Sequence, residues 1–242
     1  MSEPDALIVD DRSGVRHLIL NRPEKINAID FDQHLRLKEN FEKADVDPSV
    51  KVLALSGVGR GFCAGDDLAS TGISGHDPYK HRRVDLELGS GPSLLLESCG
   101  VLRRLSKPTV ALMHGIALGS GYDYSLSCDF RVVTADIRYG DPRINLALWA
   151  AEGWSYKLPR LVGQSLVSRI AYLGDPMNGE RAYEFGLAHR VVSGEPDIID
   201  SSREFLDMLM ELSSPAYSNM KKNMLDSLDA NFSQSQSMSL TS

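Results

Sequence analysis

The sequence is poor in cysteine. Its 242 residues include three cysteines, Cys63, Cys99 and Cys128, and they show no paired spacing. An odd count without regular spacing argues against a disulfide framework. No spacing of His, Cys and Asp resembles a zinc site. We therefore expect a reduced, cytoplasmic protein that binds no metal.

Long apolar runs and clusters of basic residues are also missing. No stretch approaches the roughly 18–20 consecutive apolar residues that a membrane helix needs, and the start, Met-Ser-Glu-Pro-Asp-Ala, lacks the features of a signal peptide. The chain has 26 basic and 33 acidic residues, a formal net charge of −7. Because the basic residues are scattered, we expect neither a nucleic acid nor an anionic membrane as a partner.

Apolar residues and glycine, by contrast, are plentiful. Hydrophobic residues make up 42% of the chain and 20 residues are glycine, enough for one globular domain with a sizeable core. We divide the chain into a core region at 1–195 and a C-terminal helical region at 196–242, whose Ser/Gln-rich tail reads as a frayed end.

The spacing of apolar residues alternates between strand-like and helix-like segments. This alternation predicts an α/β fold with right-handed crossovers, and from residue 155 onward the pattern is mainly helical. Strands are expected at 6–9, 15–21, 50–56, 109–113, 130–135 and 137–140, and helices at 30–44, 94–105, 122–127, 177–186 and 201–228.

Two glycine-rich loops each follow a predicted strand. They read Gly61-Phe-Cys-Ala-Gly-Asp-Asp-Leu68 and Gly115-Ile-Ala-Leu-Gly-Ser-Gly-Tyr-Asp123. Glycine lets a backbone approach a ligand closely, and a helix N-terminus presents unpaired N–H groups. Two such N–H groups from separate loops would form an oxyanion hole for a polarised carbonyl, although each loop alone also fits a tight structural turn.

Together with other motifs, these loops resemble the crotonase, or enoyl-CoA hydratase/isomerase, superfamily. The resemblance runs from about Val9 to about Lys222. The further motifs are Asn21-Arg-Pro-Glu-Lys-Ile-Asn-Ala28, the Lys107-Pro108 pair before the second loop, Leu158-Pro-Arg-Leu-Val-Gly163 and Ala182-Tyr-Glu-Phe-Gly-Leu-Ala-His-Arg-Val-Val192.

The resemblance implies a crotonase-type ββα spiral core with a C-terminal helical trimerisation region. It implies a homotrimer or a dimer of trimers, and an acyl-CoA thioester as substrate without a further cofactor. The thioester oxygen would lie between two backbone N–H groups, by motif position those of Ala64 and Ser120, where Ser120 replaces the usual glycine.

Substrate-binding residues are also implied by motif position. Residues of the first loop, with Ala64 among them, would line the thioester end of the substrate tunnel. The start of the second loop would line it as well. Lys25 is a candidate for the adenosine end, but it reads equally well as a solvated lysine. The lining residues are Ala64, Gly65, Asp66, Asp67 and Gly119.

Two positions matter for acid–base chemistry. Hydration of a double bond requires one group to deprotonate water and another to protonate the α-carbon, and the family's hydratases use two glutamates. Asp123 stands at the first glutamate position, and an acid at a helix start is also a common cap. Arg143, in Gly140-Asp-Pro-Arg-Ile-Asn145, stands at the second. Arginine stays protonated and is no base, but it could bind a carboxylate or a second carbonyl of a substrate.

A substitute acid is available further along the chain. Glu152 lies where dienoyl-CoA isomerases and β-diketone hydrolases of the family carry an extra acid, and it could pair with Asp123. Contact with Arg143 would lower the pKa of Glu152 and keep it ionised. Glu152 is equally explained as the first acid of a helix. Trp149 is either pocket wall or core, and His81 either shapes the acyl pocket or belongs to a solvated basic face.

These residues predict an acyl-CoA enzyme of the hydratase/isomerase type that stabilises a thioester enolate. Two alternatives stay open. Arg143 would suit C–C bond hydrolysis of a β-diketone, or a decarboxylation, on the same fold. The loss of the second glutamate would suit a catalytically weak protein that binds CoA esters.

Overall fold

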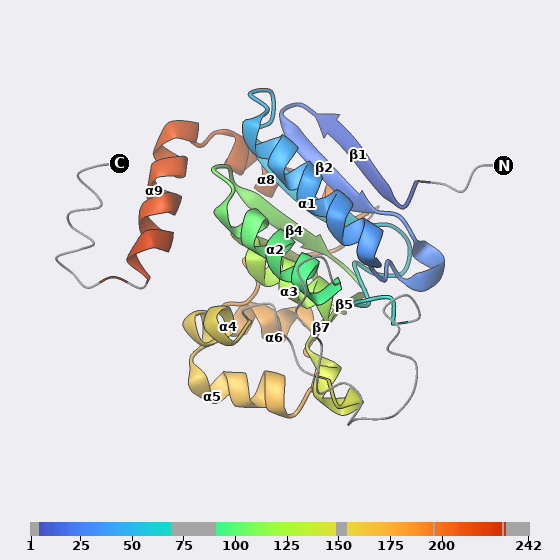
Figure 1. Ribbon diagram of the computed structural model, residues 1–242. Coiled ribbons are helices and arrows are strands. Elements are labelled where there is room, and N and C mark those ends of the chain that lie inside the picture. Colours follow the sequence, from blue (N-terminus) through green and yellow to red (C-terminus); the bar gives the residue numbers. More distant parts are fainter. Residues whose placement is uncertain (1–4, 69–90, 149–153, 196, 229, 231–242) are drawn as a thin grey trace.

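The main sheet joins strands from both ends of the chain. The computed structural model describes residues 5–68, 91–148, 154–195, 197–228 and 230. The sheet has the strand order β1-β2-β3-β4-β6-β8, and all neighbouring strands run parallel except β1 and β2, which are antiparallel. Figure 1 labels β1, β2 and β4 of this sheet. The strands are β1 Leu7–Arg12, β2 Val15–Leu20, β3 Val52–Gly57, β4 Thr109–Met113, β6 Phe130–Thr134 and β8 Arg190–Val192.

The predicted N-terminal hairpin is confirmed. β1 and β2 pair antiparallel, with Arg12 opposite Val15. The two residues between them, Ser13 and Gly14, have φ angles of 49° and 86°. Positive φ at both positions is what a two-residue hairpin turn of the favoured twist requires. β1 is longer than expected because its exposed acidic end still pairs with β2.

Alternate residues of the parallel strands face two separate cores. On β3, Leu53 and Leu55 pack toward α1 (Phe31–Val46) and α2 (Gly91–Arg104). Val52 and Ala54 pack on the opposite face, where the apolar side of α8 (Arg203–Met210) covers the sheet. A strand buried on both faces is expected to be apolar throughout, which is why the sequence identified β3 and β4.

The chain repeats one path three times. After each central strand it crosses to a second, smaller sheet and then enters a helix or helical turn. β5 (Ile116–Leu118) follows β4, β7 (Arg138–Gly140) follows β6, and the two pair in parallel. After β3, Cys63 makes an isolated parallel bridge to Ala117 of β5. Both glycine-rich loops therefore lie where the chain crosses from the large sheet to the small one.

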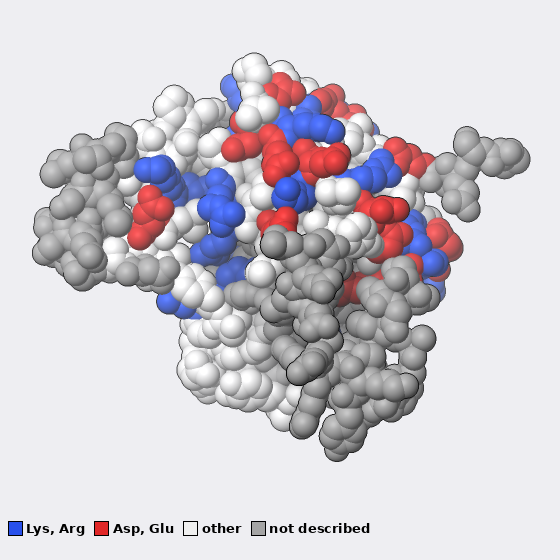
Figure 2. Space-filling model, viewed as in Figure 1, with Lys and Arg blue, Asp and Glu red and all other residues white. Residues whose placement is uncertain are grey.

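Helix α1 begins where the sequence placed it. Asp30 is its N-cap, and its carboxylate accepts the backbone N–H of Gln33, whose side chain in turn reaches the Asp30 N–H. This reciprocal capping box satisfies two N–H groups that have no partner within the helix. On its outer side the helix carries the i,i+4 pairs Lys38–Glu42 and Glu39–Lys43. Figure 2 shows charges of both signs interspersed over this part of the surface.

The second half of the chain departs from expectation in two places. β8 is a strand at the edge of the sheet, whereas the whole region after residue 155 was expected to be mainly helical. The single long helix expected at 201–228 is instead two helices, α8 and α9 (Ser214–Ser227), because Pro215 starts a new helix at its first turn. Among the described helices, none has both the length and the apolar content needed to cross a bilayer.

The remaining helical segments are short. The predicted helix at 177–186 is confirmed over a shorter span, as α6. The bounds of these short segments are η1 Pro23–Lys25, α3 Ser120–Ser127, η3 Pro142–Leu146, α4 Trp154–Val162, α5 Gln164–Val167, η4 Ser168–Tyr172, α6 Gly179–Glu184 and α7 Ile198–Ser201.

The loop crossing at Gly115 yields a test of the fold. Gly115 has φ +60°, and a Cβ there would collide with the carbonyl oxygen of Arg60. Gly186 has φ +73° with no described heavy atom within 4 Å of its Cβ position. We expect Gly186→Ala to cost about 1 kcal/mol of unfolding free energy through backbone strain alone. Gly115→Ala should cost more, about 2–4 kcal/mol, because overpacking adds to strain. Urea titrations would measure both, and equal losses would contradict the close approach of the two loops.

Candidate active site

A cluster of polar contacts holds the base of the first glycine-rich loop. Asp67, at the end of that loop, accepts from Arg22 at 2.9 Å and from Lys25 at 2.7 Å. The Arg22 guanidinium also reaches Asp30 and Gln33 at the start of α1. Lys25 and Asp67 therefore tie the loop to the N-terminal segment, and their predicted contacts with a substrate stay predictions.

The backbone N–H groups of the first loop differ in their partners. The N–H of Ala64 donates to the carbonyl of Ile26 at 2.9 Å, and that of Asp67 to Ile29 at 2.8 Å. The N–H of Gly65 points to the sulfur of Cys63. Among the described residues, the Asp66 N–H has no acceptor. The expectation for Ala64 is therefore wrong in this structure, because its N–H is consumed in the backbone.

The second loop offers a matching group. Ser120 is the first residue of α3, and its N–H has no acceptor within the described part of the chain, as expected for a helix N-terminus. Gly119 precedes it with φ 53°. A Cβ placed on Gly65 would lie 3.7 Å from the Ser120 nitrogen, so the two loops are in close contact. The unpaired N–H groups of Asp66 and Ser120 thus lie on adjoining backbone segments.

Asp123 lies one helical turn beyond Ser120 and is fully buried. Its side chain is 0% exposed, and its Oδ2 lies 2.8 Å from Nη1 of Arg143. Burial raises the pKa of Asp123 above its ordinary value, although the charge of Arg143 opposes this. Asp123 is therefore more than a surface cap on α3: it is a buried carboxyl with an enhanced tendency to hold a proton.

Arg143 is held by two acidic residues. Its Nε and Nη2 atoms donate to the two carboxylate oxygens of Asp141 at 2.7 and 2.8 Å, while Nη1 faces Asp123. Asp141 also caps η3 by accepting the backbone N–H of Arg143. An Asp followed by Pro at a helix start is a recognisable cap, so the sequence does contain a local signal for Asp141.

Lys157 is a buried cation that sequence reasoning missed. It comes from α4, and its ammonium group donates to the Ser127 hydroxyl at 2.8 Å. Ser127 in turn donates to the backbone carbonyl of Asp123. The positive charge of Lys157 joins that of Arg143 in opposing the rise in the Asp123 pKa. No local pattern in the sequence predicts that a lysine of a distant helix is buried next to Asp123.

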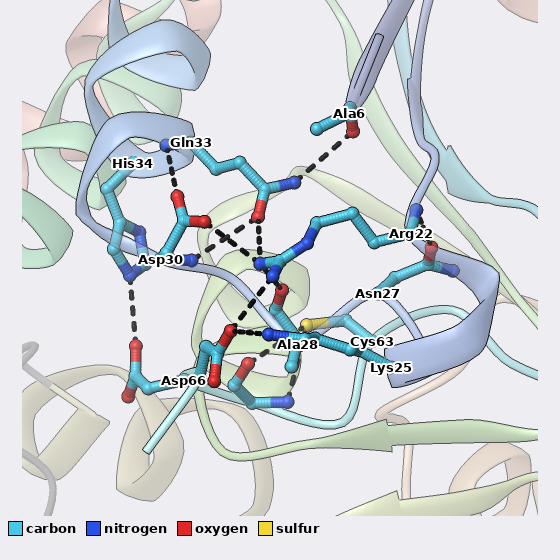
Figure 3. Close-up of polar contacts among 12 residues, drawn as sticks. Ala6, Arg22, Lys25, Asn27, Ala28, Asp30, Gln33, His34, Cys63 and Asp66 are labelled. Carbon is cyan, nitrogen blue, oxygen red and sulfur yellow. Dashed lines mark hydrogen bonds and ion pairs between the residues drawn. The ribbon is translucent and has the colours of Figure 1, made fainter. Parts of the chain in front are cut away.

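Sequence reasoning also missed a contact of the buried His34 side chain with Asp66. His34 of α1 places Nε2 2.9 Å from Oδ1 of Asp66, and its Nδ1 lies 2.8 Å from the hydroxyl of Tyr124 (Figure 3 shows His34 and Asp66). The Asp66 side chain, expected only to line the thioester end of the site, thus has a specific partner.

Several expectations cannot be compared with these contacts. Glu152, Trp149 and His81 lie outside the described residues, so the proposed pair of Glu152 with Asp123 stays a prediction. Within the described residues, no group of three or more His, Cys, Asp or Glu side chains could hold a metal ion. Burial raises the pKa of the Cys63 thiol to about 12, so it remains protonated and is no nucleophile at neutral pH.

Comparison with known proteins identifies the family. The family profile described as Enoyl-CoA hydratase/isomerase matches residues 10–240. The chain belongs to the enoyl-CoA hydratase/isomerase, or crotonase, family. Its α/β architecture is the crotonase fold: a solved structure of a Pseudomonas aeruginosa protein superimposes with a TM-score of 0.86 at 30% identity, covering 98% of this chain and 97% of that one.

Relatives within the family carry different names. A protein of Mycobacterium tuberculosis named as a probable enoyl-CoA hydratase is 32% identical over 93% of this chain and 78% of its own length. The 1,2-epoxyphenylacetyl-CoA isomerase of Escherichia coli is 30% identical over 75% of this chain and 68% of its own. The chain is thus similar to enzymes that act on CoA thioesters by more than one reaction.

The buried Asp123 carboxyl predicts a pH-dependent stability. Because its pKa is raised in the folded state, the folded protein binds this proton more tightly than the unfolded chain does. The resulting stabilisation is present at low pH and is lost as pH rises from about 3.8, the ordinary value, through the folded pKa. In urea titrations between pH 4 and 8, we expect the stability of Asp123→Asn to rise relative to the wild type as pH increases.

The exposed Asp136 provides the control for this measurement. Asp136→Asn should show a difference from the wild type that stays constant over the same pH range. A constant difference for Asp123→Asn as well would show that Arg143 fully compensates the buried carboxylate.

Proposed function

We propose that this protein is an acyl-CoA enzyme of the enoyl-CoA hydratase/isomerase type that stabilises a thioester enolate. The observation that carries the proposal is the pair of unpaired N–H groups, from Asp66 and Ser120, on adjoining loops. Two preorganised donors of this kind can bind the oxygen of a thioester as negative charge develops on it. Asp66 takes the place that motif position had given to Ala64.

Asp123 is the acid–base group of the proposed mechanism. It lies on the same helix as Ser120, so a substrate whose carbonyl is bound at the start of α3 has its α-carbon near the helix's first turn. A carboxyl with a raised pKa both takes and returns a proton more readily at neutral pH than an ordinary aspartate. The positive charges of Arg143 and Lys157 limit the rise in the Asp123 pKa. Asp123 can therefore still ionise and act as a base.

The arrangement of Arg143 weakens the case for C–C bond cleavage. That alternative assumed an arginine able to bind a second carbonyl or a carboxylate of the substrate. In the structure its Nε, Nη1 and Nη2 atoms all contact Asp141 or Asp123. The guanidinium is therefore occupied by the carboxyl groups of Asp141 and Asp123. Hydration or isomerisation is the better-supported reaction class.

The proposed function includes an oligomeric state and a cellular location. We propose a homotrimer or a dimer of trimers in the cytoplasm, acting on an acyl-CoA thioester with no cofactor beyond the CoA of the substrate. The family supports the substrate class, and the oligomeric state follows from the resemblance alone.

Exchange of the α-protons of a saturated acyl-CoA in deuterated water tests the mechanism without knowledge of the true substrate. We expect the wild type to catalyse exchange, and Asp123→Asn to lower the rate by about 100-fold or more because the base is lost. Calorimetry should show that the variant still binds the thioester. Binding without exchange in the wild type would instead support a protein that only binds CoA esters.

The oxyanion hole can be tested at Ser120 by removing a single N–H group. Proline is tolerated at the first position of a helix and has no N–H, so Ser120→Pro should leave α3 in place. We expect it to lower α-proton exchange by about 100- to 1,000-fold, the usual effect of losing one such donor. Ser120→Ala keeps the N–H and is the matched control. Equal rates in the two variants would exclude the Ser120 N–H as a donor.

A further inference from the structure

An open cavity lies between the C-terminal end of α2 and the helix α9. The volume of this α2–α9 cavity is about 480 Å³, and sites for small molecules typically measure roughly 300–1,000 Å³. Two helices line it with basic side chains, Arg103 and Arg104 from α2 and Lys221 and Lys222 from α9. Figure 2 shows a group of Lys and Arg side chains in this part of the surface, between the positions that α9 and α2 have in Figure 1.

The α2–α9 cavity lies at the far end of the elements that carry the proposed oxyanion hole. Its lining residue Ser106 precedes β4, whereas the second glycine-rich loop follows β4. β4 has five residues, and a strand of this length spans about 15 Å. Helix α3 begins at Ser120 and has eight residues, which corresponds to about 12 Å. Asp129, just beyond the end of α3, contacts Lys221 of the cavity, so the cavity is separate from the proposed site of the thioester oxygen.

The two lysines of the cavity have acidic partners. Lys221 is buried, and its ammonium group donates to Asp129 at 2.7 Å. Asp129 also accepts the backbone N–H and the hydroxyl of Thr109 at the start of β4, which ties this wall to the sheet. Lys222 and Asp226 lie one turn apart on α9, with Nζ 3.7 Å from Oδ2. These pairs compensate the charges of both lysines.

The two arginines of α2 have no such partner. The helix dipole favours basic residues in the last turn of a helix, so their presence in the sequence alone requires no ligand. Within the described part of the chain, however, neither guanidinium forms a hydrogen bond or an ion pair. Burial lowers the pKa of Arg103, and the charge of Asp129 opposes this only in part. Because arginine stays protonated nonetheless, Arg103 and Arg104 bring two positive charges to the cavity without a carboxylate in contact.

Tyr156 of α4 adds an aromatic wall beside these charges. The Cζ atom of Arg160 lies 3.5 Å from the centre of the Tyr156 ring, and that of Arg103 lies 5.9 Å from it. Such cation–π contacts hold the ring in place. Leu105 and Leu225 contribute aliphatic surface to the same cavity. The cavity thus presents two guanidinium groups together with an apolar surface.

This combination selects a ligand by its charge and by its apolar part. Guanidinium groups bind phosphate through pairs of parallel hydrogen bonds. A phosphate monoester carries about −1.5 to −2 charges at pH 7, which matches two arginines without acidic partners. A single carboxylate would leave one of these charges uncompensated, and inorganic phosphate would leave the apolar surface without a partner.

We propose that the α2–α9 cavity binds a small organic phosphate monoester. Arg103 and Arg104 hold the phosphate group, and the organic part lies against Tyr156 and the neighbouring leucines. Binding makes and breaks no covalent bond. This site does not depend on the enzymatic activity proposed above, because none of its residues belongs to the two glycine-rich loops.

Calorimetric titration with phenyl phosphate tests the site. This probe joins a phosphate monoester to a small ring, and phenol is the matched ligand without the phosphate. We expect one molecule to bind per chain, and Arg103→Met or Arg104→Met to weaken binding by about 10-fold or more, because a hydrogen bond between charged groups is lost. Arg203→Met changes an exposed arginine of α8 outside the cavity and should leave the affinity unchanged.

Several outcomes would overturn the proposal. One is the absence of phenyl phosphate binding at millimolar concentrations, and another is equal affinity in the wild type and in both arginine variants, with their folds intact by circular dichroism. Phenol binding as tightly as phenyl phosphate would exclude recognition of the phosphate. Inorganic phosphate binding as tightly as phenyl phosphate would exclude recognition of the organic part.

Coenzyme A also carries a phosphate monoester, and a competition experiment distinguishes the two sources of this group. Phenyl phosphate is titrated in the presence of saturating butyryl-CoA. We expect its affinity to stay unchanged, because the cavity and the proposed oxyanion hole lie at opposite ends of β4 and α3. Displacement by butyryl-CoA would show that the cavity belongs to the thioester site and would overturn a separate site. A failure of α-proton exchange would contradict the proposed function and leave this binding result intact.

Discussion

The parallel bridge between Cys63 and Ala117 is the contact on which the site depends. It carries two backbone hydrogen bonds, from Cys63 to Ile116 and from Leu118 to Cys63, and it joins the first crossing of the chain to the second. Each glycine-rich loop begins at this bridge. Gly65 and Gly119 have positive φ angles, and a Cβ on Gly121 would overlap Cys63, so glycine at these positions allows the two loops to approach closely. The unpaired N–H groups adjoin because the two backbones are paired a few residues earlier.

Around this backbone frame, acidic side chains are accompanied by basic residues from other parts of the chain. Asp67 is paired with Arg22 and Lys25, Asp66 with His34, and Asp123 with Arg143. An isolated buried charge is costly, whereas a charge with a well-placed partner is tolerated. The partners also differ in effect. His34 favours an ionised Asp66, while the burial of Asp123 outweighs Arg143 and favours a bound proton. Neighbouring carboxyls with opposite tendencies can divide binding and proton transfer between them.

The crotonase family supplies this frame to enzymes of several reactions, and fold alone does not choose among them. In this chain Arg143, which by motif position stands where the family's hydratases have a second glutamate, is paired with Asp141 and Asp123. In the proposed mechanism, this arrangement leaves Asp123 as the proton-transfer carboxyl on α3.

The sequence by itself determined the strands β1 to β4 and the start of α1, because those signals are local: a hairpin turn at Ser13 and Gly14, apolar runs buried on both faces, and a capping Asp30 followed by Gln33. It also located both glycine-rich loops and Asp123, because each of these motifs consists of residues that are adjacent in the sequence. It did not identify β8, which is defined by its pairing with β6. It also did not show that the unpaired N–H of the first loop belongs to Asp66 and not to Ala64, because this depends on the hydrogen bond from Ala64 to the Ile26 carbonyl. The tertiary structure alone brought His34, Lys157 and Asp141 to the site. These residues come from separate elements, and long-range contact between side chains leaves no periodic trace in the sequence.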